Sequence, residues 1–140
     1  MYCGVGTISI YVSKYVKKVV GVEVSKSSIK DATVNKELNS CQNVEFIRGK
    51  SEDKIQSIIK DYKAETVIVD PPRKGLEKSL IEVISKSQVE KVIYVSCNPT
   101  TLVRDLKLFT ENGFEVVEVE GYDMFPNTVH VETVVLMYRI

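Results

Sequence analysis

Cys97 is the residue of this sequence whose type and position most directly suggest covalent chemistry. It lies in the segment Ser96-Cys97-Asn98-Pro99, directly after a short apolar run at residues 92–95. A thiol between the end of a strand and the start of a helix is placed where the thiolate, the nucleophilic form, is favoured. The commoner fate of a lone cysteine is to fill the core. Position alone therefore leaves the nucleophile and the core residue as equal interpretations.

Asp70 is a second candidate, because it also follows an apolar run, at residues 66–69. It begins residues 70–75 (Asp-Pro-Pro-Arg-Lys-Gly), whose prolines end the strand pattern and make a rigid loop. Ligands of open α/β sheets bind beyond the carboxyl ends of the strands, so this carboxylate is well placed to bind one. A strand-ending turn with a capping aspartate is the simpler alternative.

A glycine turn at residues 3–7 (Cys-Gly-Val-Gly-Thr) precedes a helical pattern at residues 8–16. Gly4 and Gly6 let the backbone approach a nucleotide-like ligand at a helix N-terminus. Glu23 ends the next strand pattern, 17 residues after Gly6, where a carboxylate can accept both hydroxyls of a ribose. The third glycine of the dinucleotide motif is absent, which favours S-adenosylmethionine over NAD. For the glycines alone, a plain tight turn is the alternative.

Two further polar side chains lie near the end of the chain. His130 is the only histidine, and a lone histidine is more often a hydrogen-bonded structural residue than a catalyst, which is the interpretation adopted here. Glu132 stands near the start of an apolar strand pattern. A carboxylate there is costly unless it is paired or used, so Glu132 is a candidate functional residue.

Short β-branched runs alternate with helical patterns along most of the chain. Strand patterns lie at residues 18–23, 44–47, 66–69 and 92–95, and helical apolar faces lie at residues 55–62 and 102–109, the second followed by a stop at Asn112-Gly113. This alternation predicts a doubly wound, mostly parallel α/β sheet. Residues 114–120 and 131–140 are joined by a loop too short for a helix of normal length, so we expect them to form an antiparallel hairpin at one edge.

Composition narrows the function classes. The 140 residues are 44% hydrophobic and 27% charged, which is ordinary for a soluble domain, and no apolar run approaches the ~20 residues that span a bilayer. We therefore expect a cytoplasmic protein without a membrane partner. Lys plus Arg and Asp plus Glu both equal 19, so the chain lacks the basic excess of proteins that grip nucleic acid unaided. Cys3, Cys41 and Cys97 have no CxxC spacing, which argues against structural zinc or a disulfide framework.

The start of the chain is unusual for this architecture, since only Met1 and Tyr2 precede Gly4. A doubly wound domain needs a strand before its first glycine turn. We therefore expect residues 1–140 to be a single domain truncated at its N-terminus, with the first strand largely missing. A sheet without a central strand exposes two rows of unpaired backbone groups.

Together and in this order, the motifs resemble those of the RNA uridine-5-methyltransferase family, from Tyr2 to the end of the chain. The resemblance is carried by Tyr2-Cys3-Gly4-Val5-Gly6, Val22-Glu23, Asp70-Pro71-Pro72-Arg73, Ser96-Cys97-Asn98-Pro99-Thr100-Thr101, Arg104-Asp105, Met124-Phe125-Pro126 and His130-Val131-Glu132. It implies a class I methyltransferase fold, which is Rossmann-like, with S-adenosylmethionine as cofactor. It also implies ribosomal or transfer RNA as the partner, bound through the full-length protein, and no metal within this segment.

The resemblance assigns roles to individual residues. Cys97 corresponds to the nucleophile that adds to carbon 6 of uracil, and Glu132 to the general base that removes the proton from carbon 5. The positions that correspond to the cofactor site, or would line it, are Tyr2, Gly4, Thr7, Glu23 and Asp70. Many relatives have histidine where this chain has Asn127, so no chemistry is assigned to that position.

Two rival classes are kept. One is another Rossmann-like enzyme, either a nicotinamide dehydrogenase or an amino-methyltransferase that uses an Asp-Pro-Pro-aromatic loop. Arg73 stands where the aromatic ring would stack on a base, and neither rival needs Cys97 to meet Glu132. The other is a non-catalytic, truncated remnant.

The expected truncation gives a first testable prediction. Because the first strand and the upstream segments are expected to be missing and the net charge is zero, the isolated 140 residues should show little or no methylation of a uridine-containing RNA. Transfer of a radioactive methyl group from S-adenosylmethionine measures this. Robust methylation by the isolated chain would contradict it.

Overall fold

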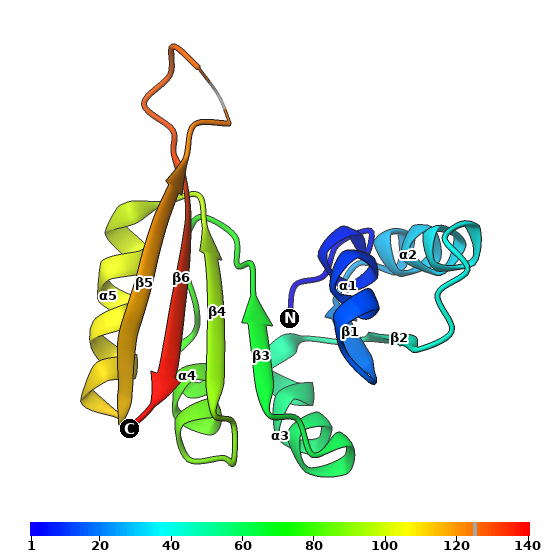
Figure 1. Ribbon diagram of the computed structural model, residues 1–140, viewed down its shortest axis with the longest axis horizontal. Coiled ribbons are helices and arrows are strands. Elements are labelled where there is room, and N and C mark those ends of the chain that lie inside the picture. The colour runs from blue at the N-terminus through cyan, green and yellow to red at the C-terminus, as the bar shows by residue number, and fades with distance from the viewer. Residues whose placement is uncertain (125) are drawn as a thin grey trace. The chain divides into compact units, whose positions relative to one another are not determined.

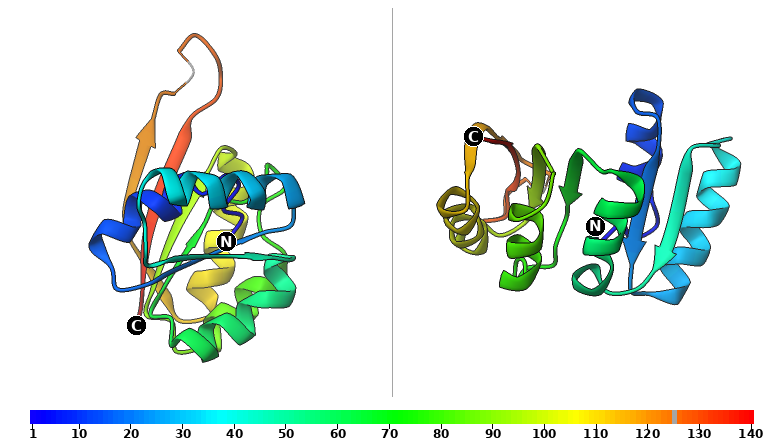
Figure 2. Two further views of the ribbon diagram at one scale, coloured as in Figure 1. Left: turned by 90° about the vertical axis from the view of Figure 1, so that its right-hand side faces the viewer. Right: turned by 90° about the horizontal axis from the view of Figure 1, so that it is seen from below.

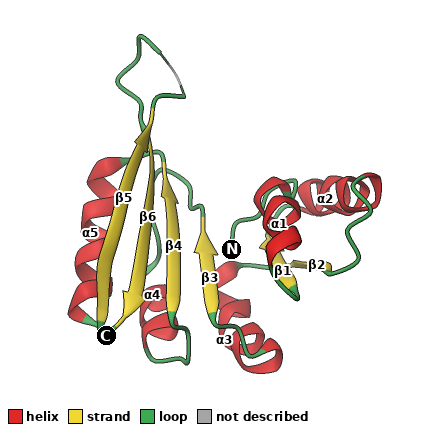
Figure 3. Ribbon diagram, in the orientation of Figure 1, coloured by secondary structure: helices red, strands yellow, loops and turns green. Residues whose placement is uncertain are grey.

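A computed structural model of the chain describes residues 1–124 and 126–140, in two compact units, Met1–Lys54 and Ile55–Ile140. Phe125, which belongs to the predicted Met124-Phe125-Pro126 motif, lies outside the described residues. Helices and strands alternate along both units, as the sequence predicts (Figure 3).

The first unit contains a parallel pair of strands, β1 (Val19–Glu23) and β2 (Val44–Arg48), in register from Val19↔Val44 to Glu23↔Arg48. Helices α1 (Thr7–Val12) and α2 (Lys26–Leu38) pack on these strands and on each other. The helix expected over residues 8–16 ends at Val12 and continues as a 3-10 turn, Ser13–Tyr15. The hydroxyl of Ser13 donates to the carbonyl of Ile10 (2.7 Å), and such local bonds compete with the helical pattern.

The second unit is built on a four-stranded sheet in the order β3-β4-β6-β5 (Figure 1). β3 (Thr66–Val69) runs parallel to β4 (Lys91–Ser96), as alternation with helices predicts. β6 (Glu132–Arg139) is antiparallel to both β4 and β5 (Phe114–Tyr122). The predicted C-terminal hairpin is therefore confirmed, with β5 at the edge and β6, the last strand of the chain, inside the sheet.

Helices α4 (Lys78–Ser85) and α5 (Pro99–Glu111) cover one face of this sheet (Figure 2). Helix α3 (Ser51–Tyr62) belongs partly to each unit, because the first unit ends at Lys54. The core between sheet and helices is apolar and includes the fully buried side chains of Leu80, Ile84, Val92, Phe109, Phe114, Val135 and Met137. Pro99 occupies the first turn of α5 and Asn112 ends it, as expected from their types.

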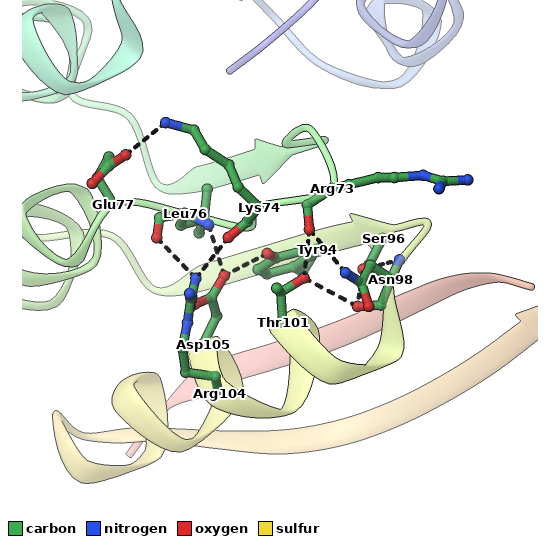
Figure 4. A network of polar contacts seen from close by, with 10 residues as sticks. All are labelled: Arg73, Lys74, Leu76, Glu77, Tyr94, Ser96, Asn98, Thr101, Arg104 and Asp105. Carbon is green, nitrogen blue, oxygen red and sulfur yellow. Dashed lines mark hydrogen bonds and ion pairs between the residues drawn. The ribbon is translucent and has the colours of Figure 1, made fainter.

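A buried carboxylate, that of Asp105 on α5, joins three elements of this unit (Figure 4). Its side chain is 0% exposed. One oxygen accepts hydrogen bonds from the backbone N–H of Leu76 and the hydroxyl of Tyr94 on β4, both at 2.7 Å. The other accepts from Nε of Arg104 at 2.9 Å. The loop after β3, strand β4 and helix α5 are thereby held at one point.

The loop after β3 fits closely against this carboxylate. Gly75 has φ +77, and a Cβ atom there would lie 2.6 Å from both Asp105 Oδ2 and Arg104 Nη2. Arg104 Nη2 also donates to the carbonyls of Lys74 (3.0 Å) and Leu76 (3.2 Å). The path of the loop is therefore set by hydrogen bonds to α5.

We expect Asp105→Ala to lower the free energy of unfolding by about 2–5 kcal/mol, because it leaves the donors of Leu76 and Tyr94 unpaired in the core and removes the contact with half-exposed Arg104. Tyr94→Phe should cost only about 1–3 kcal/mol, since it removes one donor to the same carboxylate. Urea-induced unfolding followed by circular dichroism measures both. Lys107→Gln, which breaks an exposed ion pair with Glu111, is the control and should change stability by less than about 1 kcal/mol. An Asp105→Ala variant as stable as Lys107→Gln would contradict the assigned role.

Candidate functional site

Cys97 lies in a short turn between the end of β4 and the start of α5, partly exposed to solvent. The hydroxyl of Ser96 closes the turn, since it accepts from the backbone N–H of Asn98 and lies 3.1 Å from the Asn98 carbonyl oxygen, to which it donates. The side chain of Asn98 caps α5 by accepting from Thr100 N–H (3.1 Å). The thiol thus stands just before a capped helix N-terminus, as predicted, and is not a buried core residue.

The loop that begins with Asp70 is bound to the Cys97 turn by the carbonyl oxygen of Arg73. It accepts hydrogen bonds from Nδ2 of Asn98 (2.9 Å) and from the hydroxyl of Thr101 (3.1 Å) (Figure 4). Asp70 and Cys97 both follow the carboxyl ends of adjacent parallel strands, β3 and β4. The structure therefore brings these two predicted residues to the same end of the sheet.

Glu132 reaches the same end from the opposite direction. β6 runs antiparallel to β4, and its last pair with β4 is Ser96↔Thr133, so Cys97 and Glu132 each lie one residue beyond this pair. Asp70 is exposed as a residue, but its carboxyl group lies among protein atoms and near Glu132. This partial burial and, secondly, the charge of Glu132 raise the pKa of Asp70 above its usual 3.8. Two carboxyl groups and a thiol thus share one end of this sheet.

The first unit contains a second predicted cluster, at the carboxyl end of β1. Glu23 accepts from the backbone N–H groups of Gly4 (3.1 Å, Oε2) and Ser25 (2.9 Å, Oε1). The N–H of Cys3 donates to the carbonyl of Val22 at 2.9 Å. The glycine turn is therefore attached directly to the end of β1, and each carboxylate oxygen of Glu23 keeps a further lone pair for a ligand.

Tyr2 and Thr7 lie at the two ends of the glycine turn. Tyr2 has φ +57, in the left-handed region, and its hydroxyl donates to Glu52 of α3 at 2.6 Å. Thr7 is the exposed first residue of α1. Burial raises the pKa of the neighbouring Cys3 thiol to about 11, which disfavours its thiolate form.

The two glycines of the turn differ in their surroundings. At Gly6 (φ +86), a Cβ atom would lie 2.6 Å from the ring of Phe46 and 3.2 Å from Cβ of Ala32, so only glycine fits against the core. At Gly4 (φ +52), a Cβ atom would have nothing within 4 Å. Gly6 is thus needed for packing, while Gly4 borders space that a ligand can use.

The predicted residues therefore form two groups, one in each unit: Tyr2, Gly4, Thr7 and Glu23 at the end of β1, and Asp70, Cys97 and Glu132 at the end of the larger sheet. That all of them share one edge stays a prediction.

Sequence reasoning gave Asp105 no role, although its position three residues after Leu102 and four before Phe109, inside an apolar stripe, was a signal. Tyr94 and Ser25 carried no such signal.

Within residues 1–124 and 126–140, no group of three metal-ligating side chains is close enough to hold an ion. No helix in this described part is long and apolar enough to cross a bilayer.

The chain is similar to known RNA methyltransferases over its whole length. A family model described as tRNA (uracil-5-)-methyltransferase matches residues 1–140. The chain is 51% identical to an RNA methyltransferase of Clostridium acetobutylicum and 47% identical to one of Bacillus cereus, in both cases over 99% of the chain. It spans about 30% of the length of these curated relatives.

Solved structures give the same result for the fold. The tRNA (uracil-54, C5)-methyltransferase of Pyrococcus abyssi, in complex with S-adenosyl-L-homocysteine, matches with a TM-score of 0.84 and 35% identity, over 98% of this chain and 32% of that one. An rRNA methylase from Streptococcus thermophilus matches with a TM-score of 0.74 at 13% identity, over 99% of this chain and 82% of that one, which shows the fold alone. The predicted class I methyltransferase fold is confirmed.

The contrast between the two glycines gives a prediction for the full-length protein. Both alanine variants carry left-handed strain of about 1–2 kcal/mol. Gly6→Ala must also move the ring of Phe46, so it should lose about 1–3 kcal/mol more in urea unfolding. Gly4→Ala should be the more stable variant and, if the cofactor occupies the open space beside Gly4 as predicted, should bind S-adenosylmethionine weakly in calorimetry. Wild-type affinity in Gly4→Ala would show that this space is not used.

Proposed function

We propose that this chain, which belongs to the tRNA (uracil-5-)-methyltransferase family, carries the catalytic centre of an enzyme that methylates carbon 5 of a uridine in transfer or ribosomal RNA. The observation that carries the proposal is the β4–β6 register, which brings Cys97 and Glu132 to neighbouring strand ends. A nucleophile and a base in this relation can act on one uracil ring. The relative from Pyrococcus abyssi, which acts on uracil 54 of tRNA at carbon 5, supports the choice of atom.

The residues around the glycine turn fit S-adenosylmethionine as the cofactor. Glu23 offers free lone pairs on both carboxylate oxygens for the ribose hydroxyls, and the space beside Gly4 allows the backbone to be approached closely. Tyr2 and Thr7 lie at the two ends of the same turn, and Asp70, at the end of β3, is the further cofactor-site position that the resemblance implies. S-adenosylmethionine, when bound, supplies the methyl group as an electrophile on a sulfonium centre.

Cys97 would supply the nucleophile that makes carbon 5 reactive. Its Sγ forms a bond to carbon 6 of uracil, and the electrons of the 5,6 double bond move toward the carbonyl at carbon 4 to give an enolate. Carbon 5 of the enolate is then nucleophilic enough to accept a methyl group. Cys97 lies just before the capped N-terminus of α5, at the end of the sheet where β6 begins.

Glu132 would complete the reaction as the general base. After carbon 5 has been methylated, the carboxylate removes the remaining proton from that carbon, the 5,6 double bond forms again and the Sγ–carbon 6 bond breaks. The thiolate of Cys97 is thereby regenerated. Glu132 is partly buried at the start of β6, so it can face a ring that enters above Cys97. The uridine must be unpaired or flipped from its stack to enter.

Substitution of the two residues in the full-length protein should cause different failures. Cys97→Ala should form no adduct and no 5-methyluridine, because the nucleophile is lost. Glu132→Gln should allow attack and methylation but slow the release by about 10²–10⁴-fold, which is the usual contribution of a general base. A methylated RNA–protein species that survives denaturant should then accumulate. Gel electrophoresis with labelled RNA, and mass spectrometry of the nucleosides, measure both outcomes.

Two variants serve as controls. Cys41→Ala removes a thiol from the first unit, and Glu118→Gln removes an exposed carboxylate on β5; both should keep wild-type activity. Activity retained in Cys97→Ala would overturn the proposal. So would a Glu132→Gln variant that remains fully active and traps nothing.

A further inference from the structure

The side chain of Arg73 starts from a rigid base at the end of the sheet that carries Cys97. Two prolines precede it, and its own carbonyl oxygen is held by Asn98 (2.9 Å) and Thr101 (3.1 Å). The side chain itself is exposed and extends away from the Asp105 network (Figure 4). The guanidinium is thus displayed toward solvent from a backbone that is fixed against the Cys97 turn.

The partner of this guanidinium in the structure is an imidazole. Nη2 of Arg73 lies 3.3 Å from Nε2 of His130. Because a guanidinium can only donate, Nε2 must accept, which assigns the proton of a neutral His130 ring to Nδ1. This contact joins the loop after β3 to the segment just before Glu132. His130, which the sequence analysis interpreted as a structural residue, thus contacts the guanidinium of Arg73.

Arg73 differs from its cationic neighbours in having no carboxylate. Lys74 pairs with Glu77 at 2.7 Å and Arg104 pairs with Asp105 at 2.7 Å, whereas the ion pairs among the residues that the structure describes include none of Arg73. A guanidinium that keeps several donors in its planar fork is suited to bidentate binding of a phosphate. The chain has zero net charge, so it has no general excess of cations to attract a phosphate. A guanidinium without a carboxylate partner therefore stands out as a phosphate ligand.

We propose that Arg73, oriented by His130, binds a backbone phosphate of the RNA next to the target uridine. The inference rests on the proposed function and extends it to the binding of the RNA substrate. Uracil is neutral, so the phosphate is the anionic group that RNA brings to this position. Phosphate contacts fix register without reading sequence, which is what a uridine needs in order to enter above Cys97. His130 acts as a positioning residue.

The salt dependence of RNA binding tests the proposal. The full-length protein is studied as a Cys97→Ala background, so that no adduct forms, with a single-stranded RNA that the wild-type enzyme methylates. Adding Arg73→Gln should weaken binding about ten-fold at low salt and reduce the slope of log affinity against log salt by about 0.7, the value for one phosphate on a single strand. Lys74→Gln is the matched control, since its charge is already paired with Glu77, and should leave the slope unchanged.

Replacing single phosphates by uncharged methylphosphonates identifies the phosphate that is bound. Two RNAs, each with one methylphosphonate on one side of the target uridine, are compared, and one of them should bind less tightly to the Cys97→Ala protein. The Arg73→Gln protein should show no further loss at that linkage. His130→Ala should reproduce part of the loss, and His130→Gln, which can still accept through its side-chain oxygen, should restore it. An unchanged affinity for S-adenosylmethionine in all variants shows that the defect lies in RNA binding.

Other results overturn the inference. If Arg73→Gln keeps the wild-type salt slope while kcat falls in the active enzyme, the guanidinium acts on the uracil ring and not on a phosphate. If it weakens S-adenosylmethionine binding alone, its ligand is the cofactor carboxylate. A failure of the proposed function can be told apart from a failure of this inference. In that case the wild-type protein would form no 5-methyluridine and no adduct with any RNA, regardless of the effect of Arg73→Gln on the salt slope.

Discussion

Asp105 has 0% exposed surface, yet it accepts hydrogen bonds from the backbone of Leu76, the hydroxyl of Tyr94 and the guanidinium of Arg104. A buried carboxylate is tolerated only when its oxygens are satisfied in this way, so the three donors must keep their places. The loop after β3, strand β4 and helix α5 share this requirement. The single carboxylate of Asp105 in the core therefore fixes the end of the sheet at which Asp70 and Cys97 lie.

The two units position their candidate residues by different means. In the first, backbone geometry dominates, since a left-handed Gly6 packs against Phe46 and the N–H groups of Gly4 and Ser25 hold the carboxylate of Glu23. In the second, side chains bind the loops to one another. The exposed backbone at Gly4 suits a ligand that is recognised by its ribose and its shape. Loops fixed by side chains suit a site whose side chains must keep set positions relative to one another.

Local patterns predicted the elements well. The strand at Thr66–Val69 and the helix that starts at Pro99 lie where periodicity and proline placed them, because burial on both faces and a fixed φ are local properties. The insertion of β6 between β4 and β5 and the shift in register between Val116 and Glu118 were not predictable, since they depend on pairing between distant segments. The same holds for the bond between Arg73 and His130, which are 57 residues apart.

The antiparallel pairing of β4 with β6 has a consequence for how this protein can diverge. Side chains alternate between the faces of a strand, so a deletion of one residue within β6 would reverse the faces of all its side chains on one side of the deletion. Changes of length outside the strands are under no such parity rule. Insertions and deletions between homologues should therefore be rare within β6, where a single one would put the pairing with β4 out of phase.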